Sequence, residues 1–436
     1  METKSQLISN LNKMQKDLKN QNSYYGKCDW DERPNYIMAH VRKNIIEQLC
    51  AQLPERRKLT MDVFKQYLKS YADQAKLSEV ERCYFIYYWI GHNIEYDLKT
   101  FLSGKNKDCS PDYVLKTGMS VCAGFSELFK LLVECLGIEC YNIPCFAKGL
   151  GFQVGNAIPD KDNHEHNGVK INNGWYLIDS TWGAGSIVNG KFEKSFNDFY
   201  FCCDPKEFVI THFPKDPSWQ LISKPVTKEQ FSIFPFMDKR FFQLGFLSMT
   251  PFACSVTTEK IIDVTFDFIP QLRKRLSMSA HLFLNNKNLP NTCLVQKYDK
   301  YFKVRCLLNK KGSYLIHFMA SLGDKSKDQY LITTMKVTCN KDQSEKLEFP
   351  QMQNYGTLIM DSPILDNIKA GQNVYFKFYS EEAEEIEIVF DDNWIPINRG
   401  ANGYFEKSVV AKGKKISICE KIAGKTYPRF IFKVHK

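Results

Sequence analysis

The sequence predicts an α+β fold in its first half and two β-sandwich modules in its second half. Before about residue 138 the apolar residues repeat with the 3.6-residue period of an amphipathic helix, and from Glu139 onward the period changes to two. Beyond about residue 240 the chain contains short alternating strands at intervals near ten residues. Helices followed by antiparallel strands indicate a mixed core, and the regular strand spacing is typical of sandwiches.

Length and composition indicate a globular protein of two or three domains. The chain has 436 residues, of which 44% are hydrophobic and 25% are charged, close to the average for folded proteins. These values argue against a disordered, collagen-like or filamentous protein. The longest apolar stretches, such as residues 128–133, are far shorter than the roughly 20 residues of a membrane-spanning helix, and residues 1–20 lack the apolar centre of a signal peptide. We therefore expect no membrane span and no secretion.

The net charge and the cysteine content indicate which binding partners and which cellular compartment to expect. The net charge of +10 is spread along the chain, and the densest basic cluster is only residues 273–275, so we expect no binding to nucleic acid. The 15 cysteines are odd in number and lie in apolar runs as often as in loops. We interpret them as reduced thiols, which predicts a cytoplasmic protein.

Residues 1–34 are predicted to form an amphipathic N-terminal tail. One apolar seam with 4, 3, 4 spacing runs through Leu7, Leu11, Met14 and Leu18. A seam about two heptads long is too short for a stable coiled coil by itself. We expect a docking helix or a partly ordered tail.

Two helices are predicted in the residues that follow. The first begins near Thr60, and its apolar face is expected to contain Val63, Phe64, Tyr67 and Leu68. The second is capped by Ser78 with Glu81 in the capping-box position, and it ends near Gly91.

A third helix and a strand hairpin complete the predicted core, residues 35–203. This helix contains Cys122 in its first turn and ends at Gly137, and its apolar positions are Phe125, Leu128, Phe129, Leu132, Val133 and Leu136. Strands are predicted at 139–147, 164–171 and 175–181, the last two joined by a turn at residues 172–174.

The remaining residues are predicted to be a connector and two sandwich modules. Five prolines interrupt residues 204–240, which we expect to wrap around the core without long regular elements. Residues 241–342 form the first β module and residues 343–436 the second. Their predicted strands include 260–268, 280–284, 301–307, 312–321, 331–338, 373–379, 385–390 and 429–434.

One group of residues is typical of a site for nucleophilic catalysis. The N-terminus of a helix favours a thiolate over a thiol, and Cys122 lies in such a first turn. An imidazole beside it could form an ion pair with the thiolate and later protonate a leaving group, provided that an acceptor holds its second ring nitrogen. The hairpin supplies both groups, with His164 and His166 on its first strand and Asp179 on its second.

Strand parity tests whether these side chains can meet. With a two-residue turn at Asn172 and Asn173, residue 166 lies opposite residue 179, and residue 164 lies one diagonal step away on the same face. A three-residue loop would put both histidines on the face opposite Asp179. Geometry therefore permits a Cys–His–Asp site without choosing between His164 and His166.

The same residues also have simpler interpretations. Cys122 could be a small apolar packing residue, the two histidines could be solvated, and Asp179 could cap a turn. No zinc pattern competes, because the other groupings lack paired C-x-x-C spacing: Cys135, Cys140 and Cys145 are five apart, and Cys202, Cys203 and His212 are not paired. With no phosphate-binding glycine loop either, we expect no metal and no cofactor.

Three strings are distinctive: GMSVCAGFS at 118–126, NHEHN at 163–167 and GWYLIDSTWG at 174–183, with further matching segments at 89–97, 196–201, 204–208 and 212–220. Together they resemble the transglutaminase-like superfamily, and more narrowly the kyphoscoliosis peptidase and hillarin group. The resemblance covers roughly residues 35–240. It implies a papain-like core, and the β modules resemble the immunoglobulin-like modules that follow this core in the group.

The resemblance assigns roles to individual residues. Cys122 matches the nucleophile, His164 the first histidine of the family's H-x-W-N string, and Asp179 the acid that ends its W-x-x-x-D string. His166 replaces the family's tryptophan, which changes the wall next to the catalytic histidine without removing a member of the triad.

The resemblance implies a cytoplasmic thiol enzyme that hydrolyses peptide or isopeptide bonds through an acyl-enzyme. Its implied partners are protein substrates, among them cytoskeletal or muscle-type structural proteins, and it could be associated with the cytoskeleton. Two alternatives stay open: an acyl-transferring transglutaminase, and an inactive adaptor that binds cytoskeletal proteins. Fold alone does not decide among these activities.

Overall fold

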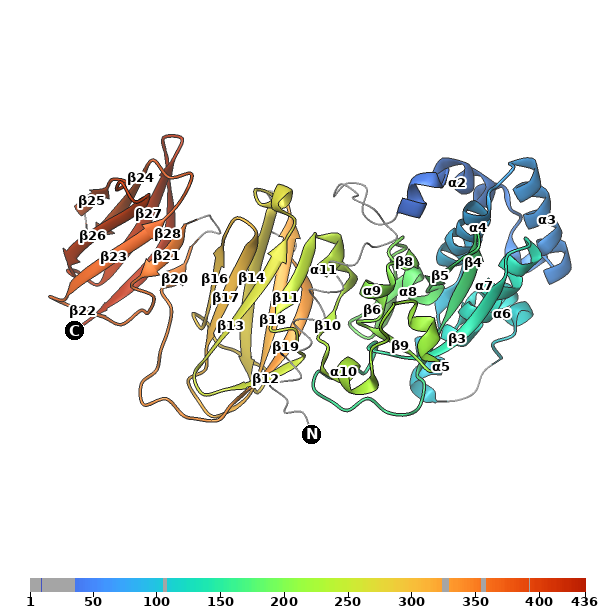
Figure 1. The fold of residues 1–436 in the computed structure, drawn as a ribbon, viewed down its shortest axis with the longest axis horizontal. Helices are drawn as coiled ribbons and strands as arrows, with labels where there is room; N and C mark the ends of the chain where they lie inside the picture. Colours follow the sequence, from blue (N-terminus) through green and yellow to red (C-terminus); the bar gives the residue numbers. More distant parts are fainter. Residues whose placement is uncertain (1–8, 10–35, 105–107, 324–328, 354–357, 392) are drawn as a thin grey trace. The chain divides into compact units, whose positions relative to one another are not determined.

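The computed structural model describes residues 9, 36–104, 108–323, 329–353, 358–391 and 393–436 (Figure 1). The seam predicted in residues 1–34 lies outside the described residues. Beyond Ser9, the described residues fall into two compact units, residues 36–232 and residues 233–436. Each unit is described by itself.

The first unit combines helices with an antiparallel sheet, as the change in hydrophobic period predicts. Its helices are α2 (Lys43–Gln52), α3 (Met61–Gln74), α4 (Glu79–Asn93), α5 (Leu98–Ser103), α6 (Pro111–Thr117), α7 (Cys122–Cys135), α8 (Ser180–Ala184), α9 (Pro205–Phe208) and, at its end, α10 (Lys228–Ile233). Short 3-10 helices lie at Tyr36–His40, Arg56–Lys58 and Pro217–Gln220.

The main sheet of this unit has the strand order β8–β5–β4–β3–β9, with antiparallel neighbours throughout. Its strands are β3 (Cys140–Ala147), β4 (His164–Ile171), β5 (Gly174–Ile178), β8 (Phe201–Cys203) and β9 (His212–Pro214). The short strands β1 (Glu95–Tyr96) and β2 (Met119–Ser120) pair in parallel, and β6 (Gly185–Val188) pairs with β7 (Lys191–Lys194). Strand β9 lies within the stretch expected to be a connector, yet it forms one edge of the main sheet.

Local sequence signals explain where the helices begin. The Thr60 hydroxyl accepts a hydrogen bond from the Val63 amide, and the Glu81 carboxylate accepts one from the Ser78 amide at 2.9 Å, so the predicted helix start near Thr60 and the predicted capping box are both confirmed. The predicted face of α3 is partly wrong, because Val63 and Tyr67 are 38% and 36% exposed. The buried face of α3 consists instead of Met61, Phe64, Leu68 and Ala72.

The β4–β5 hairpin confirms the register on which the site depends. Ile171 pairs with Gly174 across a two-residue turn, and Asn172 and Asn173 have φ values of 49° and 67°. Consecutive positive φ values give a turn whose twist matches that of the strands, and asparagine tolerates them. Strand β5 is shorter than predicted, because Asp179 leaves the strand and caps α8.

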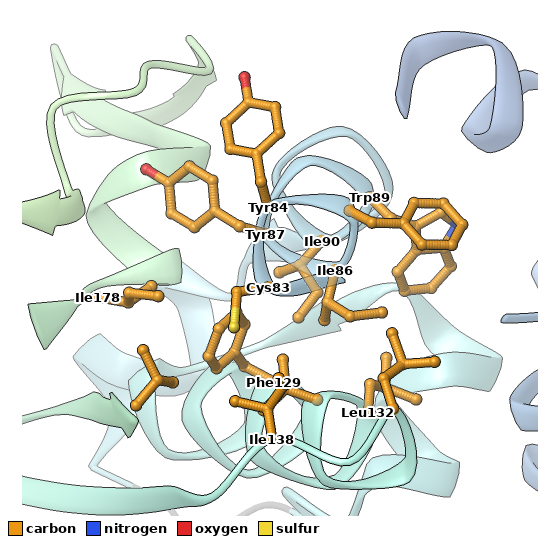
Figure 2. Packing of buried hydrophobic residues seen from close by; sticks show 14 of the residues in the cluster. Cys83, Tyr84, Ile86, Tyr87, Trp89, Ile90, Phe129, Leu132, Ile138 and Ile178 are labelled. Atoms are coloured by element: carbon orange, nitrogen blue, oxygen red, sulfur yellow. The ribbon is translucent and has the colours of Figure 1, made fainter. Parts of the chain in front are cut away.

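Helices α4 and α7 build the hydrophobic core beside the sheet. Figure 2 shows Cys83, Ile86 and Ile90 of α4 facing Phe129 and Leu132 of α7. These side chains are completely buried, and burial of each large apolar side chain stabilises the fold by about 1.5–3 kcal/mol. The core therefore fixes α7, which carries Cys122 at its first position.

The second unit consists of strands grouped into pairs of facing sheets. In the first β module the sheets have the orders β10–β19–β18–β14–β15, with β12 beside β19, and β11–β13–β17–β16. Helix α11 (Lys239–Gln243) accompanies the strands β10 (Phe236–Met237), β11 (Phe246–Thr250), β12 (Ser255–Thr258), β13 (Ile261–Phe268), β14 (Leu276–Leu284), β15 (Lys287–Asn288), β16 (Cys293–Lys297), β17 (Tyr301–Leu307), β18 (Gly312–Leu322) and β19 (Tyr330–Cys339).

The second β module repeats this arrangement with the orders β20–β28–β27–β24–β25, where β22 also pairs with β28, and β21–β23–β26. Its strands are β20 (Gln351–Met352), β21 (Ile359–Ser362), β22 (Ile368–Lys369), β23 (Asn373–Tyr379), β24 (Glu385–Phe390), β25 (Asn393–Ile397), β26 (Tyr404–Val410), β27 (Lys415–Ile422) and β28 (Lys425–His435). Rings from opposite sheets meet in each module, with centroids 4.8 Å apart for Phe266 and Phe318 and 5.8 Å apart for Phe376 and Phe432. The predicted fold class is confirmed.

Candidate active site

Cys122 is the first residue of α7 and is only partly buried. The preceding strand β2 pairs with β1, where the Asp97 amide donates to the Ser120 carbonyl at 2.8 Å. Gly124 lets this segment approach the first turn closely, because a Cβ atom at that position would lie 2.0 Å from the Ser120 hydroxyl oxygen. The sulfur is thus held at the N-terminus of α7.

His164 is the first residue of β4, and its Nε2 atom lies 2.6 Å from Oδ2 of Asp179. The imidazole is 8% exposed, and burial by itself would lower its pKa. The Asp179 carboxylate and interactions with the Cys122 side chain outweigh burial and raise the pKa of His164 from 6.5 to about 10. The structure therefore brings Cys122, His164 and Asp179 together, with the imidazole between the other two groups.

Asp179 has no exposed surface and accepts hydrogen bonds at both carboxylate oxygens. Oδ1 accepts from the Trp182 amide at 2.9 Å, which caps α8, while Oδ2 faces His164. Burial favours the neutral acid, yet the charge and hydrogen bond of His164, together with the hydrogen bond of His212, hold the pKa of Asp179 below its ordinary value. The capping interpretation of Asp179 and its predicted role in the site are compatible, because capping uses Oδ1 and the contact with His164 uses Oδ2.

His166 lies two residues along β4 and is 1% exposed. Neither of its ring nitrogens has a hydrogen-bond partner among the described residues. Burial and the neighbouring His212 hold the pKa of His166 well below its ordinary value, so this imidazole is neutral. It packs against the Phe208 ring with centroids 4.9 Å apart. The geometry thus pairs His164, and not His166, with Asp179.

His212 belongs to the same buried cluster, although its sequence context suggested only a zinc ligand, an interpretation that the missing paired spacing excluded. Strand β9 pairs His212 with Ala147 of β3, and the Nε2 atom of His212 lies 3.2 Å from Oδ2 of Asp179. Its ring stacks on Phe208 with centroids 3.9 Å apart. The only available sequence signal was that His212 opens one of the strings that resemble the family.

Asn167 fixes β4 against the helix that carries the thiol. Its side-chain amide donates to the Ser126 carbonyl and hydroxyl of α7, each at 3.1 Å, and to the Asn142 side chain of β3 at 2.9 Å. The two bonds to Ser126 are buried, so losing them would leave buried polar atoms without partners. Asn167 therefore limits sliding of His164 relative to Cys122.

The ligand atoms of His164, Asp179 and His212 lie within 4.8 Å of one another, which is close enough to consider a metal ion. Zinc ligands at about 2.0–2.1 Å in a tetrahedral site stand roughly 3.3 Å apart. The 2.6 Å separation of His164 Nε2 and Asp179 Oδ2 is instead a charge-assisted hydrogen-bond distance. We therefore assign these residues to a hydrogen-bonded cluster.

Family models match two parts of the chain. Residues 66–180 match the model of the transglutaminase-like superfamily, and residues 228–350 match that of the KY-like, immunoglobulin-like domain. The first range contains Cys122, His164 and Asp179, but not His212. Among the described residues, no helix is both long and apolar enough to cross a membrane.

Proteins that are similar to parts of this chain include members of the kyphoscoliosis peptidase and hillarin group. Kyphoscoliosis peptidase of Mus musculus is 33% identical over 183 residues, which cover 42% of this chain and 28% of the relative. Hillarin of Drosophila melanogaster is 30% identical over 134 residues, covering 28% of this chain and 16% of hillarin. Cytokinesis protein 3 of Schizosaccharomyces pombe is 22% identical over 213 residues, 49% of this chain and 23% of that protein.

These matches span less than a third of each relative, so they identify domains and not the function of a whole protein. They agree with the fold, in which an α+β core precedes sandwich modules. The chain therefore contains a transglutaminase-like domain that is similar to kyphoscoliosis peptidase and hillarin, followed by a KY-like, immunoglobulin-like domain.

Proposed function

We propose that the chain is a cysteine peptidase-like hydrolase of peptide or isopeptide bonds, with Cys122 as nucleophile, His164 as acid and base, and Asp179 as the group that orients His164. The observation that carries this proposal is the 2.6 Å contact between His164 Nε2 and Asp179 Oδ2, beside a partly exposed thiol at a helix N-terminus. A thiol, an imidazole and a carboxylate in this order recur in thiol acyl-transfer enzymes on unrelated folds.

The hydrogen bond to Asp179 determines the direction of proton transfer. A carboxylate only accepts hydrogen bonds, so His164 carries a proton on Nε2 and exchanges its second proton at Nδ1. The Cys122 proton moves to Nδ1, and the thiolate then attacks the carbonyl carbon of the scissile bond. Nδ1 returns the proton to the leaving amine, which leaves an acyl-enzyme on Cys122. Water deprotonated by Nδ1 hydrolyses this thioester and regenerates the thiol.

Acyl transfer differs from hydrolysis only in the last step, where an amine replaces water. The site residues are the same, so the acceptor has to be found by experiment. We propose protein substrates, because the matched relatives include one named a peptidase and one named a cytokinesis protein. We further propose a cytoplasmic location near the cytoskeleton, with cytoskeletal or muscle-type structural proteins as partners.

Covalent labelling of the full chain with a peptidyl epoxide, read by peptide mass spectrometry, tests the proposal. We expect rapid modification at Cys122 and slow modification at Cys135, which is also partly buried but lies at the opposite end of α7. Cys122→Ala should remove the rapid labelling, whereas Cys135→Ala should not. Equal labelling of both cysteines would contradict the proposal and favour the adaptor. Peptide release with and without an added primary amine then separates hydrolysis from acyl transfer.

A further inference from the structure

Two imidazoles converge on a single carboxylate oxygen. Oδ2 of Asp179 lies 2.6 Å from Nε2 of His164 and 3.2 Å from Nε2 of His212, and all three side chains are almost or completely buried. Since a carboxylate is only an acceptor, both imidazoles must present an N–H group to it. His212 therefore adds a second donor to the acid that orients His164.

Asp179 fixes the tautomer of His212, and the Thr211 hydroxyl can serve the remaining ring nitrogen. The Thr211 hydroxyl oxygen lies 2.9 Å from Nδ1 of His212, and burial lowers the pKa of His212, so this ring is neutral. A neutral ring with its proton on Nε2 accepts the Thr211 hydroxyl at Nδ1. The result is a directed chain in which Thr211 donates to His212 and His212 donates to Asp179.

The geometry points to His212 as a positioning residue that acts through Asp179, an inference that rests on the proposed hydrolase. With the Trp182 amide on Oδ1 and His212 on Oδ2, the carboxylate cannot rotate away from His164. Without the His212 donor, Asp179 would hold the His164 imidazolium less firmly, and the proton would return to the Cys122 sulfur. His212 itself touches neither the thiol nor the scissile bond in this scheme.

The titratable groups that face this chain come from several elements. His164 and His166 of β4, Asp179 after β5, and Tyr200 before β8 surround His212. Tyr96 of β1 and Cys145 of β3 interact electrostatically with Cys122. Burial keeps His166 neutral and raises the pKa values of Tyr96 and Cys145, and His164 has a pKa of about 10, so these four groups keep one protonation state between pH 6 and pH 9 in the natural chain.

Two substitutions at one position separate hydrogen bonding from packing. His212→Phe keeps an aromatic ring on Phe208 but removes the donor, whereas His212→Gln places an amide N–H near the position of Nε2. The readout is the rate of Cys122 alkylation by iodoacetamide in the full chain at pH 6 and at pH 9.5. We expect His212→Phe to slow the reaction at pH 6 about 10-fold or more, the size of one lost charge-assisted hydrogen bond, with little change at pH 9.5.

His212→Gln should recover most of the rate at pH 6. The inference would be wrong if folded His212→Phe kept the natural ratio of the alkylation rate at pH 6 to that at pH 9.5. It would also be wrong if His212→Phe and His212→Gln slowed alkylation at pH 6 equally. If His212→Phe does not fold, Thr211→Val should show the same pH-selective slowing about threefold, and its absence would be equally decisive. Alkylation needs no peptide substrate. Failure to hydrolyse any peptide would therefore count against the proposed function, while the alkylation rates would still test the role of His212.

An independent observation concerns two cysteines of the first β module. Cys293 of β16 lies directly opposite Cys306 of β17, with their sulfur atoms 3.3 Å apart. The Leu307 amide donates to the Thr292 carbonyl at 2.8 Å, so the neighbouring pair 293/306 is of the non-hydrogen-bonded kind, in which side chains approach most closely. Such pairs have Cα atoms about 4.5 Å apart, within the range that a disulfide can bridge.

We infer that Cys293 and Cys306 form a site of reversible oxidation by peroxides. Cys293 is partly exposed, so its sulfur attacks the peroxide, which releases water and leaves a sulfenic acid. The Cys306 sulfur then attacks the Cys293 sulfur, the S–S bond forms, and a second water leaves. The two thiols supply the two electrons that reduce the peroxide. The hydrogen bond to Cys293 and burial raise the pKa of Cys306, which fits Cys306 as the second and slower thiol.

Treatment of the full Cys122→Ala chain with hydrogen peroxide, followed by non-reducing peptide mapping, tests this site. We expect a cross-linked peptide pair joining Cys293 to Cys306, lighter by two hydrogens and released by dithiothreitol. Cys306→Ser should instead leave Cys293 as a sulfenic acid that dimedone captures. Both thiols remaining open to alkylation after other cysteines of the chain have oxidised would overturn the inference.

Discussion

Two buried carboxylates, Asp179 in the α+β unit and Glu420 in the second β module, have different hydrogen-bond partners. The difference distinguishes a candidate reactive site from a structural ion pair. Both side chains are completely buried. Glu420 accepts hydrogen bonds from the Arg429 Nε atom at 2.6 Å and from the Ser380 hydroxyl at 2.5 Å. Arg429 keeps its charge at any accessible pH, and no thiol takes part in these bonds.

Asp179 is held by imidazoles, which can change protonation, and one of them lies beside a partly exposed thiol. The partner and not the burial therefore decides what a buried acid can do. An arginine partner makes a fixed ion pair. A histidine partner can gain or lose a proton, so an acid that holds the histidine also affects proton exchange with a neighbouring nucleophile. Substitution in the first region should change reactivity more than stability, and substitution in the second should do the opposite.

The largest expected effect is on turnover. His164→Ala should lower the rate of peptide hydrolysis by about 10⁴-fold or more, because the nucleophile and its base work as one unit. The unfolding midpoint in urea should change far less than the rate. His92→Ala is the matched control, since His92 belongs to the same unit but is exposed and remote from the hydrogen bonds of the site. Comparable turnover in His164→Ala and His92→Ala would remove the distinction between the two carboxylates.

The second prediction concerns the ion pair. Arg429→Met should leave Glu420 as an unpaired buried charge and destabilise the second β module by about 3–5 kcal/mol, measured by urea unfolding. Alkylation of Cys122 should keep its rate. The double variant with Glu420→Leu should recover most of the lost stability, because it removes both charges. If the double variant is as unstable as the single one, the pair does more than neutralise a buried charge.

The elements around the site were predictable because they depend on local sequence. The apolar period of α7, the capping box of α4 and the Asn172–Asn173 turn each need only a few neighbouring residues. The hairpin register followed from that turn and placed both histidines of β4 on the face of Asp179. Parity could not distinguish His164 from His166, because residues two apart on a strand share a face.

His212 was missed because its position is non-local. It lies 33 residues from Asp179 in the chain, in a proline-rich stretch with no clear period, and it reaches the site only because β9 pairs with β3. No sequence pattern within β9 indicates that it pairs with β3. The buried face of α3 was misjudged for a related reason, since periodicity defines a stripe and only packing decides how wide it is.

The third prediction follows from the pKa of His164, which is raised from 6.5 to about 10. A raised folded-state pKa gives stability that is fully present below about pH 6.5 and is lost as the pH rises through about 10. The stability advantage of the natural chain over His164→Gln should therefore shrink between pH 7 and pH 10.5 in urea unfolding. The Arg429→Met/Glu420→Leu double variant contains neither charge and should keep a constant difference from the natural chain over this range, so parallel curves for His164→Gln and the double variant would contradict the prediction.

The smallest effect is expected at His166, whose buried ring nitrogens make no hydrogen bond to any residue that the structure describes. Removing such atoms relieves a desolvation cost, so His166→Phe should raise the unfolding free energy at pH 7.5 by about 1 kcal/mol and leave turnover close to that of the natural chain. The pKa of His166 is lowered on folding, so the unfolded chain takes up a proton below about pH 6.5 that the folded chain refuses. The gain should therefore grow by up to about 1.4 kcal/mol for each pH unit below 6.5. A gain independent of pH would mean that His166 is protonated inside the fold, and a large loss of turnover would place it among the residues that act on Cys122.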